Sequence, residues 1–87
     1  MNDKFNSFQE FKDALEMTLE INFTFEGNDY LIEPDPNAPY GSDRLIITNL
    51  AYPGKPHSLK NALDALNYKI NGKKLSAIWS QFTNVDC

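Results

Sequence analysis

Apolar and polar side chains alternate from residue 20 to residue 25, and this pattern constrains the fold more than any other part of the chain. A period of two residues is the period of a β-strand with one buried face. Gly27 and Asn28 follow as a two-residue turn, because glycine supplies the positive φ that tight hairpins require. The apolar run at residues 30–32 supplies the return strand, so we predict a β-hairpin over residues 20–33.

A helix is expected before this hairpin. Ser7 and Glu10 form a capping-box pair, in which each side chain satisfies a free backbone donor near the other residue. Apolar residues then recur at helical spacing, and they are Phe8, Phe11, Leu15 and Leu19. These features predict a helix over residues 8–19.

Two more helices are expected in the second half of the chain. The second helix is capped by Ser58, and its apolar stripe consists of Leu59, Ala62, Leu63 and Leu66. The third helix begins at Lys73 or Lys74, after a turn at Asn71 and Gly72. Its apolar stripe consists of Leu75, Ile78, Trp79 and Phe82.

The segments between these elements complete a small sheet. Prolines exclude regular structure from residues 34–42, whereas residues 44–48 form a third strand whose apolar centre favours the sheet interior. Residues 83–87 are a tail that is long enough to add a short strand. With 87 residues, of which 41% are hydrophobic, the chain is expected to form a single domain over residues 1–87. The fold class is α+β, an antiparallel β-meander packed against about three helices.

The charge of the chain is divided between its two halves. Residues 1–43 carry ten acids and two lysines, a net charge of −8, whereas residues 44–87 carry six bases and two acids, a net charge of +4. The total of −4 argues against a protein that binds nucleic acid mainly through phosphate contacts, since such proteins are basic overall. If the two halves occupy different surfaces, the same division predicts an acidic surface that attracts a basic partner or a basic patch that attracts an acidic one. The alternative is that the halves pack together and partly neutralise each other.

The inventory of reactive side chains favours a protein that is not an enzyme. His57 is the only histidine and is expected in an exposed loop, and Cys87 is the only cysteine. A zinc site built from these two residue types needs three or four ligands, and no cofactor or metal is expected. A competing hypothesis is an enzyme or small-ligand binder built from carboxylates alone. It requires a concave site, and a thin helical layer leaves little room for one.

The acidic hairpin supplies the first candidate site. Its four carboxylates are those of Glu20, Glu26, Asp29 and Glu33. We predict that they bind another protein with a basic surface, which makes the chain a small acidic interaction module with a regulatory or inhibitory role. A sharper alternative is an inhibitor whose carboxylates imitate DNA phosphates. The exposed edges of the hairpin or of the tail also leave a homodimer open.

The second candidate site is basic. Lys69, Lys73 and Lys74 lie close to Trp79 in the sequence, and interleaved cations and aromatic rings can bind nucleic acid. Trp79 also falls on the apolar stripe of the third helix, which favours a place in the core. The alternative function is therefore a nucleic-acid-binding accessory protein that uses this C-terminal patch.

Two segments, residues 20–32 and residues 68–79, resemble parts of small Gram-positive bacterial and phage proteins. Those proteins begin with a helix, continue into a hairpin with a glycine turn and end in a helix introduced by a KINGKKL-like sequence. The resemblance implies a cytoplasmic protein from a phage or mobile element, and it implies no catalytic residue. The single cysteine, the lack of an apolar leader and the lack of a long apolar segment likewise predict a cytoplasmic location without a membrane partner.

Overall fold

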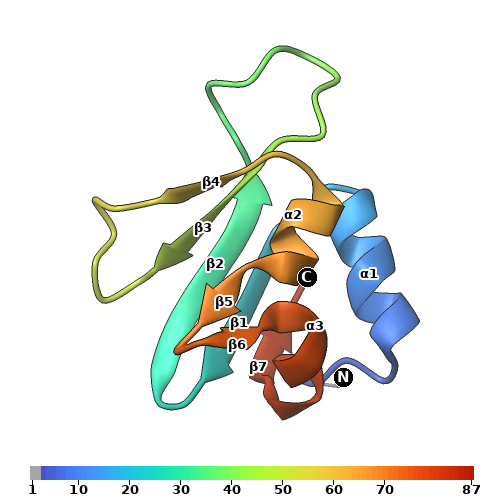
Figure 1. Cartoon of the computed structure of the whole chain (residues 1–87), viewed down its shortest axis with the longest axis vertical. Helices are drawn as coiled ribbons and strands as arrows, with labels where there is room; N and C mark the ends of the chain where they lie inside the picture. Colours follow the sequence, from blue (N-terminus) through green and yellow to red (C-terminus); the bar gives the residue numbers. More distant parts are fainter. Residues whose placement is uncertain (1–2) are drawn as a thin grey trace.

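The computed structural model describes residues 3–87, and its centre is an antiparallel sheet of five strands in the order β4-β3-β2-β1-β7 (Figure 1). The helices are α1 (Phe8–Glu16), α2 (Ala62–Asn67) and α3 (Leu75–Ile78), followed by a 3₁₀ turn, η1 (Trp79–Gln81). The strands are β1 (Ile21–Phe25), β2 (Asn28–Pro34), β3 (Leu45–Asn49), β4 (His57–Leu59), β5 (Lys69–Ile70), β6 (Lys73–Lys74) and β7 (Thr83–Asp86). The predicted α+β class, with a meander against about three helices, is confirmed.

The helices and the small β5–β6 hairpin cover one face of the sheet (Figure 1). Alternate residues of each strand point into this covered side, as the burial pattern of β1 shows. Phe82 is fully buried there, and its ring stacks on Phe23 with the centroids 4.0 Å apart. Phe11 of α1 meets the same ring edge-on at 5.6 Å, so the aromatic side chains join the sheet to the helical layer.

The hairpin over residues 20–33 is confirmed, but its turn lies one residue earlier than predicted. Phe25 pairs with Asn28, so that Glu26 and Gly27 form the two-residue loop in place of Gly27 and Asn28. Both loop residues have positive φ, +50° and +80°, as a type I′ turn requires. Glycine fits the second position, and glutamate occupies the first because its side chain has a partner elsewhere in the fold.

A second turn of the same kind joins β5 and β6. The turn predicted at Asn71 and Gly72 is confirmed, with φ values of +53° and +79°. The prediction that the third helix begins at Lys73 or Lys74 is wrong, because these two residues form β6 and α3 begins at Leu75. The tight turn brings the chain straight back on itself, so the residues after it pair as a strand before the helix starts.

The interior position predicted for the third strand is confirmed, because β3 pairs with both β2 and β4. The second helix, however, was predicted to start at Ser58, which lies in β4. The helix starts three residues later, where the Asn61 side chain accepts a hydrogen bond from the Asp64 backbone N–H (3.0 Å). Leu59 is therefore buried in the sheet, where it pairs with Leu45 of β3, and Leu63 is exposed.

The tail forms the predicted short strand. β7 pairs antiparallel with β1 across a bulge between Asn22 and Thr24. Two residues of the predicted third-helix stripe lie outside α3, since Trp79 begins the 3₁₀ turn and Phe82 follows it. Trp79 is half-buried against the core, and its ring lies 6.3 Å from that of Phe8.

The first helix ends at Glu16, three residues earlier than predicted. The Leu19 N–H donates to the Ala14 carbonyl and the Thr18 N–H donates to the Leu15 carbonyl, both at 3.1 Å. This pair of bonds is a Schellman motif, which normally places glycine in the left-handed position that Thr18 adopts with φ +52°. The reversal turns the chain toward β1 and leaves the Leu19 side chain partly exposed.

Both outer edges of the sheet have backbone donors that are blocked. At the β7 edge, the Val85 N–H donates to the Asp3 carbonyl (2.8 Å). At the β4 edge, Pro56 precedes the strand and has no N–H. The Lys60 N–H, just after β4, donates to Asp64 Oδ2 (2.9 Å). These features hinder the pairing of another strand at either edge.

Within residues 3–87, none of the helices has the length and the apolar character needed to cross a membrane. The predicted lack of an apolar leader concerns residues 1 and 2 in part, and these two lie outside the described residues.

Replacing Thr18 by glycine should stabilise the fold, because a β-branched residue is strained at positive φ. We expect Thr18→Gly to raise the free energy of unfolding by about 1 kcal/mol. Urea denaturation followed by circular dichroism measures this change. Met17→Gly is the matched control, since Met17 has a φ of −80° and should lose stability on the same substitution. A loss of stability in Thr18→Gly would contradict the account of the helix end.

Candidate functional site

Within residues 3–87, no helix covers the face of the sheet opposite α1, α2 and α3, which is called the open face below (Figure 1). Its side chains alternate with the buried ones, and β1 and β2 accordingly show half-buried or exposed residues at every second position. The residues that project from the strands here are Asn22, Thr24, Asp29, Leu31, Glu33, Ile46, Thr48, Ser58, Thr83 and Asp86. A two-layer fold of this size thus leaves one sheet surface free for contact.

The charged side chains among these projecting strand residues are all carboxylates. We call Asp29, Glu33 and Asp86 the acidic rim. Arg44 and Lys60 are the cations closest in sequence to these projecting residues, and they lie just before β3 and just after β4. Arg44 forms an ion pair with Asp35 (Nη2 to Oδ2, 3.5 Å), so its charge is largely balanced.

An apolar strip crosses the centre of the open face. It follows β3 through Ile46 and Thr48 to Leu50, whose N–H donates to the Asp29 carbonyl (2.8 Å) and continues the ladder. Leu31 of β2 stands directly beside Thr48. Leu31, Ile46, Thr48 and Leu50 are called the apolar strip below; Leu31 and Ile46 are half-buried, and Thr48 is buried with 6% of its surface exposed. Leu50 is 42% exposed, and an apolar side chain of that exposure on a free sheet surface is available for contact.

A polar hollow of about 270 Å³ adjoins one end of the strip. The Thr24 hydroxyl donates to Asp29 Oδ1 (2.6 Å), and Asn84 Nδ2 donates to Thr24 Oγ1 (3.2 Å). Asn22 and Leu50 also line the hollow. This network holds the Asp29 carboxylate in one orientation on the open face.

The four carboxylates predicted as one acidic site are not brought together. Asp29 and Glu33 share the open face, and Glu20 lies just before β1. Glu26 turns toward the helical side instead. Its Oε1 accepts a hydrogen bond from Asn71 Nδ2 (2.7 Å), and its Oε2 lies 3.6 Å from Lys73 Nζ. Glu26 therefore joins the two type I′ turns and has a structural role.

The predicted basic patch is divided as well. Lys73 is paired with Glu26, whereas Lys69 and Lys74 stand directly opposite each other on β5 and β6 and are exposed. Within residues 3–87 neither of these two lysines makes an ion pair. Like charges directly opposite in a ladder are destabilising, so this pair of cations is not explained by the stability of the fold.

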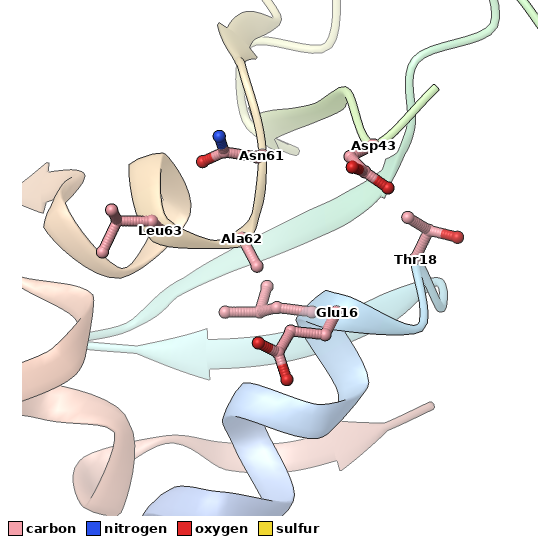
Figure 2. A pocket seen from close by; sticks show the side chains of 7 residues that line it. Glu16, Thr18, Asp43, Asn61, Ala62 and Leu63 are labelled. Atoms are coloured by element: carbon pink, nitrogen blue, oxygen red, sulfur yellow. The ribbon is translucent and has the colours of Figure 1, made fainter. Parts of the chain in front are cut away.

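Another hollow, of about 310 Å³, lies between the end of α1 and the start of α2 (Figure 2). Glu16, Thr18, Asp43 and Asn61 bring their polar groups to it, beside the exposed Leu63 (Figure 2). Glu16 forms an ion pair with Lys12 (3.6 Å). Asn61 caps α2, so two of the four polar groups in this hollow already have partners. The surface thus has more concave space than the sequence predicted.

The two reactive side chains, His57 and Cys87, lie apart from the apolar strip of the open face. His57 is exposed, as predicted, but it lies in β4 and not in a loop, with its ring 4.9 Å from that of Tyr68. Cys87 is a free cysteine at the surface. Partial burial of its thiol raises the pKa, and the carboxylates of Glu10 and Asp86 add to the shift. No group of three or more His, Cys, Asp or Glu side chains suited to a metal ion occurs within residues 3–87.

The sequence analysis missed the residues that make the open face distinctive. Leu31 and Ile46 were assigned only to apolar runs, Leu50 was assigned to no element, and Asp86 was assigned to the tail. The period of two that identified the buried side of β1 also assigns the opposite side of β2 and β3. Applying it there would have placed Leu31 with Asp29 and Glu33.

Comparison of the chain with protein-family models, with curated proteins and with solved structures finds no match. The resemblance to small Gram-positive bacterial and phage proteins is thus not supported by a matching family. The function must be inferred from the geometry.

The contact between the two turns gives a stability prediction. Glu26→Gln keeps an oxygen for Asn71 and loses only the ion pair with Lys73, which is exposed and worth less than about 0.5 kcal/mol. Glu26→Ala loses both contacts, and we expect it to lower the free energy of unfolding by about 1 kcal/mol. Urea denaturation of the two variants measures the difference. Equal stability of wild type and Glu26→Ala would remove this contact from the account.

Tyr30 gives a pH prediction. Burial raises the pKa of its phenol above the ordinary 10.0, and Tyr68 and Glu26 add to the shift. The folded state therefore holds this proton more tightly than the unfolded state, so the contribution to stability is intact below pH 10.0 and is lost as the pH rises through the folded pKa. Unfolding of Tyr30→Phe should depend less on alkaline pH than that of wild type. An identical pH dependence would contradict the raised pKa.

Proposed function

We propose that this chain is a small non-enzymatic protein-interaction module that binds a partner with a basic surface through the open face of its sheet. One observation carries the proposal: the projecting charged residues of that face are carboxylates, and they border an apolar strip. An exposed apolar centre with a charged margin is the composition of a protein-binding surface.

The two parts of this face would contribute differently to binding. The apolar strip supplies buried area at about 25 cal/mol per Å², which is the main source of affinity. The acidic rim selects the sign of the partner and speeds the encounter, and each exposed ion pair adds only about 0.2–1 kcal/mol. Binding should accordingly weaken as salt rises without vanishing.

Imitation of DNA phosphates has less support than a basic protein partner. It requires the hairpin carboxylates to form one array, whereas Glu26 is engaged with Asn71 and Lys73 on the other side of the sheet. An origin in a phage or mobile element rests on the sequence resemblance alone.

A nucleic-acid-binding accessory function is the second candidate. The observation that favours it is the exposed pair of Lys69 and Lys74, which face each other across a ladder without a carboxylate partner. Two adjacent cations on a β-ribbon are suited to contact successive phosphates. This patch lies on the helical side of the molecule, away from the open face, so the two functions can be tested separately.

Reversal of one charge on the open face should weaken partner capture. We expect tagged wild-type protein to retain a host protein from lysate after nuclease treatment, and to release it as salt rises. Glu33→Lys should retain it at least about fivefold less well, because an attraction becomes a repulsion. Quantitative mass spectrometry of the retained proteins measures the ratio.

Asp43→Lys is the matched control for this experiment. Asp43 is exposed, lies off the open face and forms no ion pair or side-chain hydrogen bond within residues 3–87, yet its substitution changes the net charge by the same amount. If capture falls equally in Glu33→Lys and Asp43→Lys, the loss is due to net charge and not to the open face. Capture that depends on intact nucleic acid, and that is lost in a Lys69→Glu and Lys74→Glu double variant, would replace the first function with the second.

A further inference from the structure

We propose that the segment bound on the open face is an amphipathic α-helix of the partner protein, with a basic residue at each end of its apolar stripe. This inference rests on the proposed function and specifies the partner of the same face. It follows from the blocked sheet edges, from the sign of the charges and from the length of the apolar strip.

The blocked edges of the sheet favour a partner that binds on the open face. A partner strand adds to a sheet by taking up free backbone donors and acceptors. At the β7 edge the Val85 N–H already donates to Asp3, and at the β4 edge Pro56 has no N–H while the Lys60 N–H donates to Asp64. Strand addition is thus hindered at both edges, and the open face offers side chains instead. Both helices and second sheets cover sheet faces in layered folds, and we infer a helix because α1 covers the other side of this sheet and because the rim spacing fits two helical turns.

The charges argue against a second copy of this chain as the occupant. Two open faces packed together would place acidic rim against acidic rim, because Asp29, Glu33 and Asp86 project from the same surface. Like charges brought together across an interface oppose association. A partner with cations around its apolar stripe removes this repulsion.

The spacing of the rim fits a helix. Glu33 stands beside Ile46 at one end of the apolar strip, and Asp29 lies beside Leu50 at the other end. Asp29 and Glu33 are four residue steps apart along β2, which separates them by roughly 13 Å. Seven or eight residues of α-helix rise about 10–12 Å and return to the same side of the helix. Long lysine or arginine side chains supply the remaining reach.

The apolar strip is matched to the space between those two cations. Ile46, Thr48 and Leu50 follow one strand, and Leu31 widens the strip at its middle. Residues three and four positions after the first cation of a helix lie between the two cations on the same side. Leucines there would contact Leu31 and Ile46.

A synthetic peptide tests this geometry directly. The probe is a helix of about three and a half turns with two lysines seven residues apart and leucines three and four positions after the first. The matched control replaces two residues on its opposite side with proline, which prevents the helix while keeping both lysines and both leucines. We expect the helical peptide to bind at least about tenfold more tightly than the proline peptide in isothermal titration calorimetry with the full chain.

Two variants of the full chain show where on its surface the helical peptide binds. Ile46→Thr and Glu33→Lys should each weaken the helical peptide about fivefold, and Asp43→Lys should leave its affinity unchanged. Circular dichroism of each variant confirms that the fold is kept. A second helical peptide with glutamate in place of both lysines should bind more weakly than either basic peptide.

The outcomes separate this inference from the proposed function. Equal affinity of the helical and proline peptides, or no binding of either while capture from lysate still depends on Glu33, would overturn the helix and leave the basic partner in place. Tight binding of the helical peptide that is unchanged by Ile46→Thr and by Glu33→Lys would overturn both, because it would place the peptide elsewhere on the molecule.

Discussion

The stacking of Phe82 on Phe23 is the contact on which the rest of the structure depends. The two rings lie 4.0 Å apart, and Phe11 and Phe25 meet the Phe82 ring edge-on at 5.6 Å and 6.0 Å. One fully buried side chain thereby links α1, strand β1 and the segment that leads into β7. A small domain has one modest core, so an aromatic cluster that contacts three elements determines where each of them lies.

This single core makes the fold one-sided. The covered face of the sheet takes the large apolar residues of every strand, whereas the opposite face keeps Leu31, Ile46 and Leu50 among carboxylates. The Glu26 carboxylate reinforces the covered side by holding the β5–β6 turn against the β1–β2 turn. The charge division along the sequence therefore becomes a division in space only in part, because two ion pairs, Glu26 with Lys73 and Asp35 with Arg44, join the two halves.

The parts of the fold that follow from local periodicity could be predicted from the sequence, and the parts set by competition between elements could not. Alternation identified β1, the apolar run at residues 30–32 identified β2, and Asn71-Gly72 identified the second turn. Ser58 is an acceptable helix cap, but the inner side of β3 needed a neighbouring strand, so the helix began at Asn61. The candidate site was predicted only in part, because the contact between Glu26 and Lys73 joins residues that are distant in the sequence.

Methyl resonances of the full chain in solution test the central claim most directly, since they report contact residue by residue. The basic helical peptide is titrated into protein labelled at its Leu and Ile methyl groups. The account predicts shifts at Leu31, Ile46 and Leu50, with no change at Leu63, which lies beside α1 on the other side of the sheet. Shifts confined to Leu63 and Leu19, with the apolar strip unchanged, would contradict the assignment of the open face as the binding surface.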